Sequence, residues 1–351
     1  MRTRITELLG IKYPIIQAPA NFVGVPRLVA AVSNAGGFGI LASGRLTPEE
    51  VREDIRAIRE QTDKPFGVNV IAGSPGFEKL AQVFIEEKVP LICHSRGNPK
   101  WIIEATKGQG IKIMAMIGAV RHAIRAEQDG ADAVIVQGLE AGGHVSYVST
   151  MVLLPLVASK VKIPVVAAGG FCDGGGLLAA LALGAEGIAM GTRFAVTQES
   201  PLPSSIKQRY LDSSEADTLV TPAITGTRLR VIRNAFVDRL EEKGQKLSWR
   251  ERISGTMKTR KMLGVSWWRF LVGGWRMRKE YEASTSELGQ MAAAAARITR
   301  AMVEGDADFG VLPSGQVCGR IGDIPSVQEV IERIVAEASG GLESVREKLL
   351  S

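Results

Sequence analysis

Short apolar segments of strand length recur eight times in the first 195 residues of the chain. Amphipathic segments of helix length separate them, with Gly, Pro or Asp at the joints. Runs that are apolar at nearly every position are typical of strands in a parallel sheet covered on both faces. The predicted strands are Tyr13–Ala18, Gly37–Ala42, Phe66–Ile71, Pro90–Cys93, Ile111–Ile117, Ala133–Gln137, Ile163–Ala168 and Gly187–Gly191. The predicted helices cover residues 25–35, 47–61, 76–88, 98–108, 120–129, 150–160 and 174–183.

Eight evenly spaced β-α units predict an α/β fold, a TIM (β/α)8 barrel. A doubly wound open sheet is the alternative, but it would not naturally give eight even units. After Phe194 the alternation stops. We therefore expect a barrel made of residues 1–199 and 286–351, with a mainly helical insertion subdomain at 200–285 after strand 8. Two later helices, predicted at Glu287–Glu304 and Ser326–Ala338, return the chain to the barrel, and one of them supplies its eighth helix.

Composition agrees with a globular domain. The chain has 351 residues, of which 45% are hydrophobic and 23% charged, which excludes a disordered or fibrous protein. The three cysteines are scattered, so neither a disulfide framework nor a metal-binding spacing is present. The N-terminus has no apolar signal region, and no uncharged apolar run reaches the roughly 20 residues of a membrane span. We expect a soluble protein in the reducing cytoplasm.

The positive charge is concentrated in one segment. Residues 228–280, here called the basic segment, hold 15 Lys or Arg and 5 Asp or Glu, together with four of the five tryptophans. The rest of the chain holds 28 basic and 32 acidic residues, so the net charge of +6 comes from this segment alone.

Three interpretations of the basic segment stay open. It is a solvated insertion whose tryptophans pack on the barrel or on the partner subunit of a homodimer. It is a surface for an anionic substrate carrier, either the phosphates of coenzyme A or an acidic acyl-carrier protein. It contacts a membrane peripherally, because aromatic and cationic residues alternate there as in interfacial segments. Nucleic-acid binding is not expected, since nothing else in the chain supports it.

Active sites of TIM barrels lie at the carboxyl ends of the strands and in the loops that follow. This rule selects candidate residues without further knowledge. They are Gln17–Asn21, Ser43-Gly44, Asn69, His94–Asn98, Gln137–His144, Ala168–Gly176 and Gly191–Arg193.

Two of these loops are rich in glycine. Gly169-Gly170 follows strand 7 and Gly191-Thr192 follows strand 8, which is where TIM barrels most often bind a phosphate. Glycine lets the backbone approach an anion closely, and N–H groups at a helix start point towards it. Arg193 either donates to that phosphate or pairs with an acidic residue.

His144 is the candidate for proton transfer, because it follows strand 6 and two glycines precede it. His122 lies in a predicted outer helix, and His94 ends a strand without such glycines. No metal-binding spacing, nucleophile elbow or Walker motif is present. A phosphate site with one histidine indicates an organic cofactor that carries the chemistry.

At these loops the chain resembles the nitronate monooxygenase (2-nitropropane dioxygenase) family of FMN-dependent TIM-barrel enzymes, which includes flavin-dependent enoyl-acyl-carrier-protein reductases. The matching stretches follow one another in order along nearly the whole chain. They are Tyr13-Pro-Ile-Ile-Gln-Ala-Pro, Ala31-Val-Ser-Asn-Ala-Gly-Gly-Phe-Gly-Ile, Lys64-Pro-Phe-Gly-Val-Asn-Val, Gly142-Gly-His, Leu-Leu-Pro155, Ala167-Ala-Gly-Gly, Met190-Gly-Thr-Arg-Phe, Glu304-Gly-Asp and Ser314-Gly-Gln.

The resemblance implies FMN, with its phosphate on the backbone of the two glycine loops and His144 as the catalytic residue. Where the family has a methionine after strand 1, this chain has Ala18-Pro19-Ala20-Asn21, which opens space beside the flavin and brings the Asn21 amide near the substrate. His94 stands where small residues are common and is the second candidate for substrate contact. The implied cofactor residues are Ala18, Pro19, Ala20, Asn69, Gln137, Gly142, Gly143, Ala168, Gly169, Gly170, Gly191, Thr192 and Gln316.

The motifs are compatible with three functions. The leading one is oxidation of a nitronate or a similar carbanionic small molecule through FMN and oxygen. The second is reduction of an enoyl thioester by NAD(P)H through FMN. The third is a barrel without flavin chemistry that serves as a binding module.

Overall fold

The computed structural model describes residues 1–72, 77–242 and 285–350, with short pieces at 253–257, 260, 267–268 and 272. Most of the basic segment, including Trp249 and Trp275, therefore lies outside the described residues. The first residue of the helix predicted at 76–88 and residues 281–284 near the end of the insertion also lie outside them. The three interpretations of that segment remain predictions.

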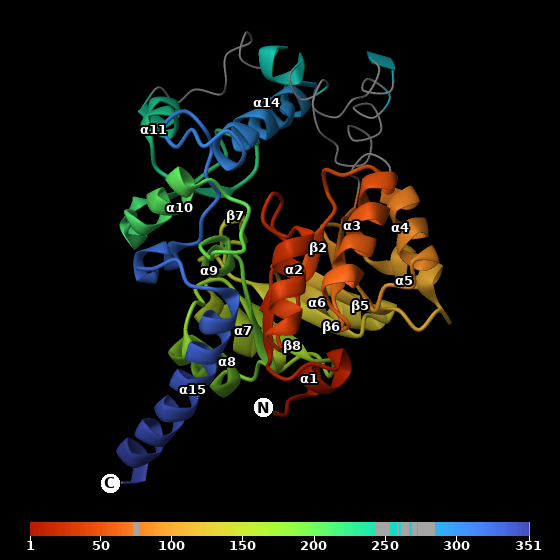
Figure 1. The fold of residues 1–351 in the computed structure, drawn as a ribbon, viewed down its shortest axis with the longest axis vertical. Helices are drawn as coiled ribbons and strands as arrows, with labels where there is room; N and C mark the ends of the chain where they lie inside the picture. The colour runs from red at the N-terminus through yellow and green to blue at the C-terminus, as the bar shows by residue number, and fades with distance from the viewer. Residues whose placement is uncertain are drawn as a thin grey trace.

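Eight parallel strands form the barrel (Figure 1) and run around it in the order β1-β9-β8-β6-β5-β4-β3-β2. A parallel bridge between Ile16 and Phe38 joins the first strand to the second and closes the circle. Each strand overlaps a predicted apolar run, so the predicted TIM barrel is confirmed. The strands are β1 (Ile15–Gln17), β2 (Ile40–Ala42), β3 (Gly67–Ile71), β4 (Leu91–Ser95), β5 (Lys112–Ile117), β6 (Ala133–Gln137), β8 (Val165–Ala168) and β9 (Gly187–Met190).

Helices cover the outside of the barrel between consecutive strands. They are α2 (Pro26–Asn34), α3 (Pro48–Gln61), α4 (Phe77–Glu86), α5 (Lys100–Thr106), α6 (Val120–Asp129), α7 (Thr150–Ala158) and α8 (Gly174–Ala182). The eighth place is taken by α15 (Val327–Leu350), which packs against α8 and α2. It was predicted to end at Ala338, but it continues to Leu350 and projects beyond the barrel (Figure 1).

Local signals explain where several helices begin and end. Thr47 and Glu50 form a capping box at the start of α3, with Pro48 in the first turn. The Asp173 carboxylate accepts a hydrogen bond of 2.8 Å from the Gly176 N–H and so begins α8. Gly130, at a φ of 102°, ends α6 in the left-handed conformation that favours glycine.

The barrel interior is apolar and closed at one end. The inward side chains of the strands, among them Ile16, Cys93 and Ile135, form one cluster with Ile5 and Leu9 of α1 (Arg4–Leu9). Arg4 of this helix pairs with Glu186, directly before β9 begins. Because α1 therefore plugs the amino-terminal ends of the strands, an active site is left to their carboxyl ends.

After β9 and the short helix α9 (Thr192–Ala195), the chain leaves the barrel. Besides helices, the described part of the insertion contains a strand pair that the sequence did not predict. β10 (Thr218–Thr221) and β11 (Leu229–Ile232) are antiparallel, and β11 also pairs with β7 (Gly143–His144), which follows β6. The helices here are α10 (Ser204–Leu211), η1 (Glu215–Asp217), α11 (Ala235–Glu242) and α14 (Thr285–Met302), and η2 (Gln316–Arg320) follows them.

The insertion has its own apolar core. Leu229 and Val231 of β11 pack with Phe236 of α11 and with Ala293 and Ala294 of α14. Figure 1 shows α10, α11 and α14 grouped above the barrel, on the side of β7. None of the described helices combines the length and apolar character needed to cross a bilayer.

Candidate active site

The inward residues at the carboxyl ends of the strands form the floor of the barrel mouth. Alternate residues of each strand fill the barrel interior, and the alternation continues to the strand ends. It brings together residues from most of the strands: Ala18, Asn69, Ser95, Met116, Gln137 and Ala168. Four of the six, all except Ser95 and Met116, are predicted cofactor residues.

A chain of hydrogen bonds fixes one side of this floor. Asn69 is 2% exposed, and its Nδ2 donates to the Cys93 carbonyl and to Ser95 Oγ, each at 2.8 Å. Ser95 Oγ in turn contacts Met116 Sδ at 3.1 Å, and the Ser43 hydroxyl donates to the Asn69 carbonyl. The Asn69 amide is therefore held in one orientation by β4, as a positioned polar group needs to be.

His144 lies in β7, above the end of β6. The Gln137 side chain donates from Nε2 to the His144 carbonyl at 2.7 Å, and Leu229 of β11 pairs with His144 across the small sheet. Burial by surrounding protein lowers the pKa of His144 to about 4, and the positive charge of Arg96 adds to the shift. His144 nevertheless remains accessible to solvent, as expected at the open mouth of a barrel. At neutral pH its imidazole is uncharged and can accept a proton.

Residues 312–316, which follow the insertion, contact two loops of the mouth: the loop at residues 138–144, which carries His144, and the loop after β9, which carries Thr192. The Gly315 N–H donates to Thr192 Oγ1 at 3.0 Å, and the Gln316 N–H donates to the Glu140 carbonyl at 3.0 Å. A Cβ on Gly142 would lie 2.6 Å from the Gly315 nitrogen, so only glycine fits there. The structure thus brings Gly142, Thr192 and Gln316 together, although they are far apart in sequence.

The glycine loops leave space for a phosphate. Gly169 and Gly170 have φ angles of 98° and 88°, and their backbone N–H groups have no hydrogen-bond acceptor among the described residues. A Cβ built on Gly191 would meet no atom within 4 Å. Free N–H donors and open space at adjacent strand ends fit an FMN phosphate. Ala18, Pro19, Ala20 and Gly143 are all partly exposed at the same mouth and leave room beside it.

Arg193 follows the second glycine loop but does not serve a phosphate. Its side chain is buried, and it donates to the Asp323 carboxylate at 3.0 Å and to the Val196 carbonyl at 2.6 Å. Of the two predicted roles for Arg193, the pairing with an acidic residue is the one observed.

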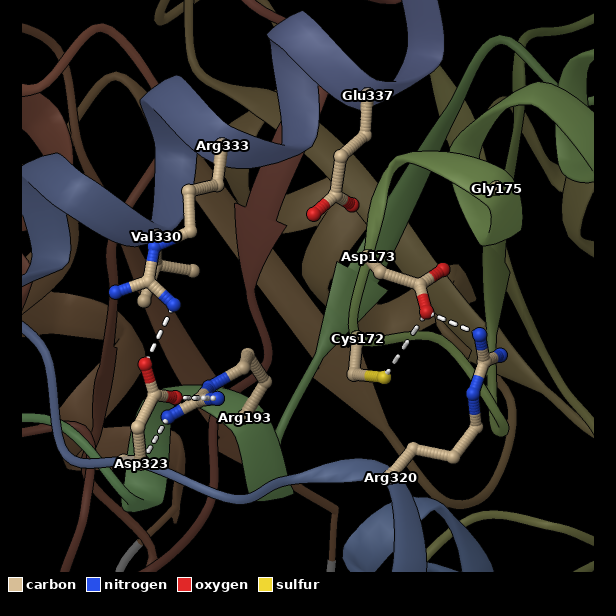
Figure 2. Close-up of a pocket in the computed structure, with 9 residues that line it drawn as sticks. All are labelled: Cys172, Asp173, Gly175, Arg193, Arg320, Asp323, Val330, Arg333 and Glu337. Atoms are coloured by element: carbon tan, nitrogen blue, oxygen red, sulfur yellow. Dashed lines mark hydrogen bonds and ion pairs between the residues drawn. The ribbon is translucent and has the colours of Figure 1, made fainter. Parts of the chain in front are cut away.

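Asp323 also pairs with Arg333 of α15, and these groups line a pocket of about 470 Å³ beside α8 (Figure 2). On its other side Arg320 pairs with Asp173, and Glu337 accepts from the Gly174 N–H at 2.8 Å. The three arginines of this pocket are thus matched by carboxylates. These ion pairs and hydrogen bonds connect α15 to the loops after β8 and β9. No predicted cofactor residue lines the pocket.

The structure does not support the predicted substrate role of His94. The residue is 1% exposed, and its Nε2 accepts a hydrogen bond of 3.3 Å from Trp101 of α5, in the outer layer. Its strand neighbour Ser95 is the one that turns inward, because successive side chains of a strand alternate between its faces. Asn21, the other predicted substrate residue, is exposed after β1, near Gly44.

Two residues at this site, Met116 and Arg230, were not predicted from the sequence, and Ser95 was predicted only as part of the range His94–Asn98. Alternation along β4 and β5 carries a signal for Ser95 and Met116, because Cys93 and Met114 precede them on the inward face. No local signal marks Arg230 of β11. Its side chain is 5% exposed and reaches the Leu139 carbonyl at the start of the His144 loop.

The nitronate monooxygenase family model matches residues 2–76 and 72–337, which together span most of the chain. A probable nitronate monooxygenase of Staphylococcus aureus is 34% identical, over 69% of this chain and 81% of the relative. FabK from Thermotoga maritima is 37% identical with a TM-score of 0.84, covering 99% of each chain. Nitroalkane oxidase from Streptomyces ansochromogenes is 27% identical with a TM-score of 0.76, covering 97% of this chain and 99% of the other.

Two further relatives match almost the full length. Both are 40% identical to this chain over 96% of each sequence, one from Rhodococcus jostii and one from Mycobacterium tuberculosis. Both carry the name (3aS,4S,5R,7aS)-5-hydroxy-7a-methyl-1-oxo-octahydro-1H-indene-4-carboxyl-CoA dehydrogenase.

Proposed function

Because this chain belongs to the nitronate monooxygenase family, we propose that it is an FMN-dependent oxidoreductase whose substrate is a coenzyme A thioester. The full-length match to the two CoA dehydrogenases carries this proposal, since it includes the insertion as well as the barrel. The match favours the thioester substrate of the second predicted function, reduction of an enoyl thioester by NAD(P)H, over a nitronate, with dehydrogenation as the named reaction of the relatives.

The described residues suit such a reaction. FMN, when bound, supplies reversible two-electron chemistry by taking up or releasing a hydride. Dehydrogenation also requires that a proton leave the substrate, and the uncharged imidazole of His144 accepts it. Asn69 and Gln137 place side-chain amides at the floor of the mouth, where the cofactor would bind. The other floor residues have small or apolar side chains. In the direction of enoyl reduction, the same histidine returns the proton.

Nitronate oxidation is the second candidate, favoured by the Staphylococcus aureus relative. It needs the same cofactor site but no site for a large carrier, and because a nitronate is already deprotonated at its α-carbon, His144 would orient it and would not accept a proton from it. The two functions therefore share the cofactor site and differ in the electron donor and in the need for a carrier site at the mouth.

An anaerobic donor screen separates the candidates. The oxidised holoenzyme is mixed in turn with the bicyclic hydroxyacyl-CoA named for the relatives, with propyl-2-nitronate, and with NADH or NADPH, while the flavin absorbance is followed. We expect the acyl-CoA to bleach the flavin. Bleaching by the nitronate alone would establish the second candidate, and bleaching by NAD(P)H followed by reoxidation with crotonyl-CoA would assign an enoyl reductase. A protein that takes up no FMN would overturn both and leave a binding module.

A further inference from the structure

Two arginines lie near His144 at the barrel mouth and come from different parts of the chain. Arg96 lies in the loop after β4, and its charge acts on the imidazole of His144. Arg228 directly precedes β11, and its carbonyl accepts a hydrogen bond of 3.2 Å from the N–H of Val145, the residue after His144. Two cationic residues therefore lie near the loop that carries the predicted proton acceptor.

The loops that carry these residues are neighbours around the mouth. β4, β5 and β6 are adjacent in the barrel, and Ser146 of the loop after β6 reaches Gly118 at the end of β5. Strands of a sheet are spaced about 4.8 Å apart, so the ends of β4 and β6 are separated by roughly 10 Å. That distance is within reach of the phosphate groups of one nucleotide.

Arg228 carries a charge that no acidic group in the described ranges balances. It forms no ion pair there, and its Nε has no hydrogen-bond partner among the same residues. Its guanidinium instead stacks on the ring of Tyr147, with 4.3 Å between the Arg228 Cζ and the ring centre. Tyr147 is 78% exposed, so the ring is open on its other side. An aromatic ring with one face exposed is able to stack a planar ligand group on that face.

We propose that Arg96, Arg228 and Tyr147 form a binding site for the nucleotide end of a coenzyme A thioester. The two guanidinium groups bind its phosphates, because arginine is the side chain best suited to charge-assisted, bidentate contact with phosphate oxygens. The open face of Tyr147 stacks the adenine ring. The thioester then extends from this site towards His144 and the floor of the mouth. This site presupposes the thioester function proposed above.

Binding of free coenzyme A tests the site without any turnover. The full-length holoenzyme is titrated calorimetrically with coenzyme A, with 3′-dephospho-coenzyme A and with pantetheine. We expect coenzyme A to bind at least 10-fold more tightly than pantetheine. Arg228→Ala and Arg96→Ala should each weaken coenzyme A binding about 10-fold, and Tyr147→Ala several-fold, while pantetheine binding stays unchanged. Arg346→Ala, which removes an exposed arginine on the projecting end of α15, is the matched control and should change neither.

Several outcomes would overturn the site. One is wild-type affinity for coenzyme A in both arginine variants while flavin content and circular dichroism stay normal. Another is equal affinity of the wild-type protein for coenzyme A and pantetheine. A third is preferential binding of a holo-acyl-carrier protein that is insensitive to Tyr147→Ala, which would assign a protein-bound thioester instead. Because these are binding measurements, they are separate from the donor screen: turnover of an acyl-CoA with unaltered binding in the variants would reject the site and keep the function.

Discussion

Arg230 of the insertion donates from Nε and Nη2 to the carbonyl oxygen of Leu139, at 3.3 and 3.0 Å. The two residues lie 91 positions apart in sequence, and the loop that starts at Leu139 ends in His144. The neighbouring pairing of Arg230 with Gly143 holds the other end of the same loop. One buried residue of the insertion thus fixes both ends of the loop that carries His144, the proposed proton acceptor.

Replacing Arg230 should therefore impair turnover through His144. Arg230→Lys keeps the positive charge but loses the two hydrogen bonds from Nε and Nη2 to the Leu139 carbonyl. We expect kcat to fall about 10- to 100-fold, because the loop that carries His144 shifts. KM should change less, and the acid limb of the pH profile should move with the new surroundings of His144. Thr218→Val, which removes only the partner of Arg230 Nη1, is the control and should have a smaller effect. Wild-type kcat and pH profile in Arg230→Lys would reject this positioning role.

His144 itself is expected to control the reaction at acid pH. Since its pKa is lowered to about 4, the imidazole stays uncharged and active well below its ordinary value of 6.5. The rate of flavin reduction by the substrate should therefore hold between pH 7 and 5 and decline near pH 4. His144→Gln should lower this rate about 100- to 10,000-fold and remove the acid limb, with FMN still bound. Stopped-flow absorbance measures both, and an unchanged rate in His144→Gln would make the residue structural.

Alanine substitutions at Gly142 and Gly191 test two different reasons for a glycine: close contact with the protein backbone at Gly142, and space for the cofactor phosphate at Gly191. A Cβ at Gly142 would strike the Ser314–Gly315 backbone, so Gly142→Ala should lower the free energy of unfolding by about 1–3 kcal/mol even without FMN. A Cβ at Gly191 meets no protein atom and its φ of −99° suits alanine, so Gly191→Ala should leave the apoprotein as stable as the wild type. Its FMN affinity should fall at least 10-fold, because the added methyl group occupies the phosphate space. Equal FMN affinity in Gly191→Ala, measured by fluorescence titration, would contradict the assigned phosphate loop.

His94 should make the fold sensitive to acid. Burial lowers its pKa to about 4, whereas in the unfolded chain it titrates near 6.5. The unfolded state therefore gains a proton first as the pH falls, and stability that is full above pH 6.5 is lost between pH 6.5 and 4. From pH 7 to 5 this amounts to about 2 kcal/mol. In His94→Phe this part of the loss should disappear, as urea unfolding at both pH values would show, and an unchanged difference would mean that His94 does not titrate in this way.

The sequence by itself determined the barrel and most of its floor. Strands buried on both faces must be apolar at every position, so the eight runs stand out in the chain, and the carboxyl-end rule then points to Asn69, Gln137 and the two glycine loops. The start of α3 and of α8 was equally readable, because caps such as Thr47 and Asp173 act within one turn of the chain.

Only the tertiary structure decided how the mouth is completed. Whether His94 or Ser95 faces inward depends on the register of β4 in the barrel, and a run that is apolar on both faces does not reveal it. The pairing of β11 with β7, the contact of Arg230 with Leu139 and the stacking of Arg228 on Tyr147 join segments far apart in sequence. Such contacts leave no local periodicity, because they arise only when the insertion folds back over the barrel.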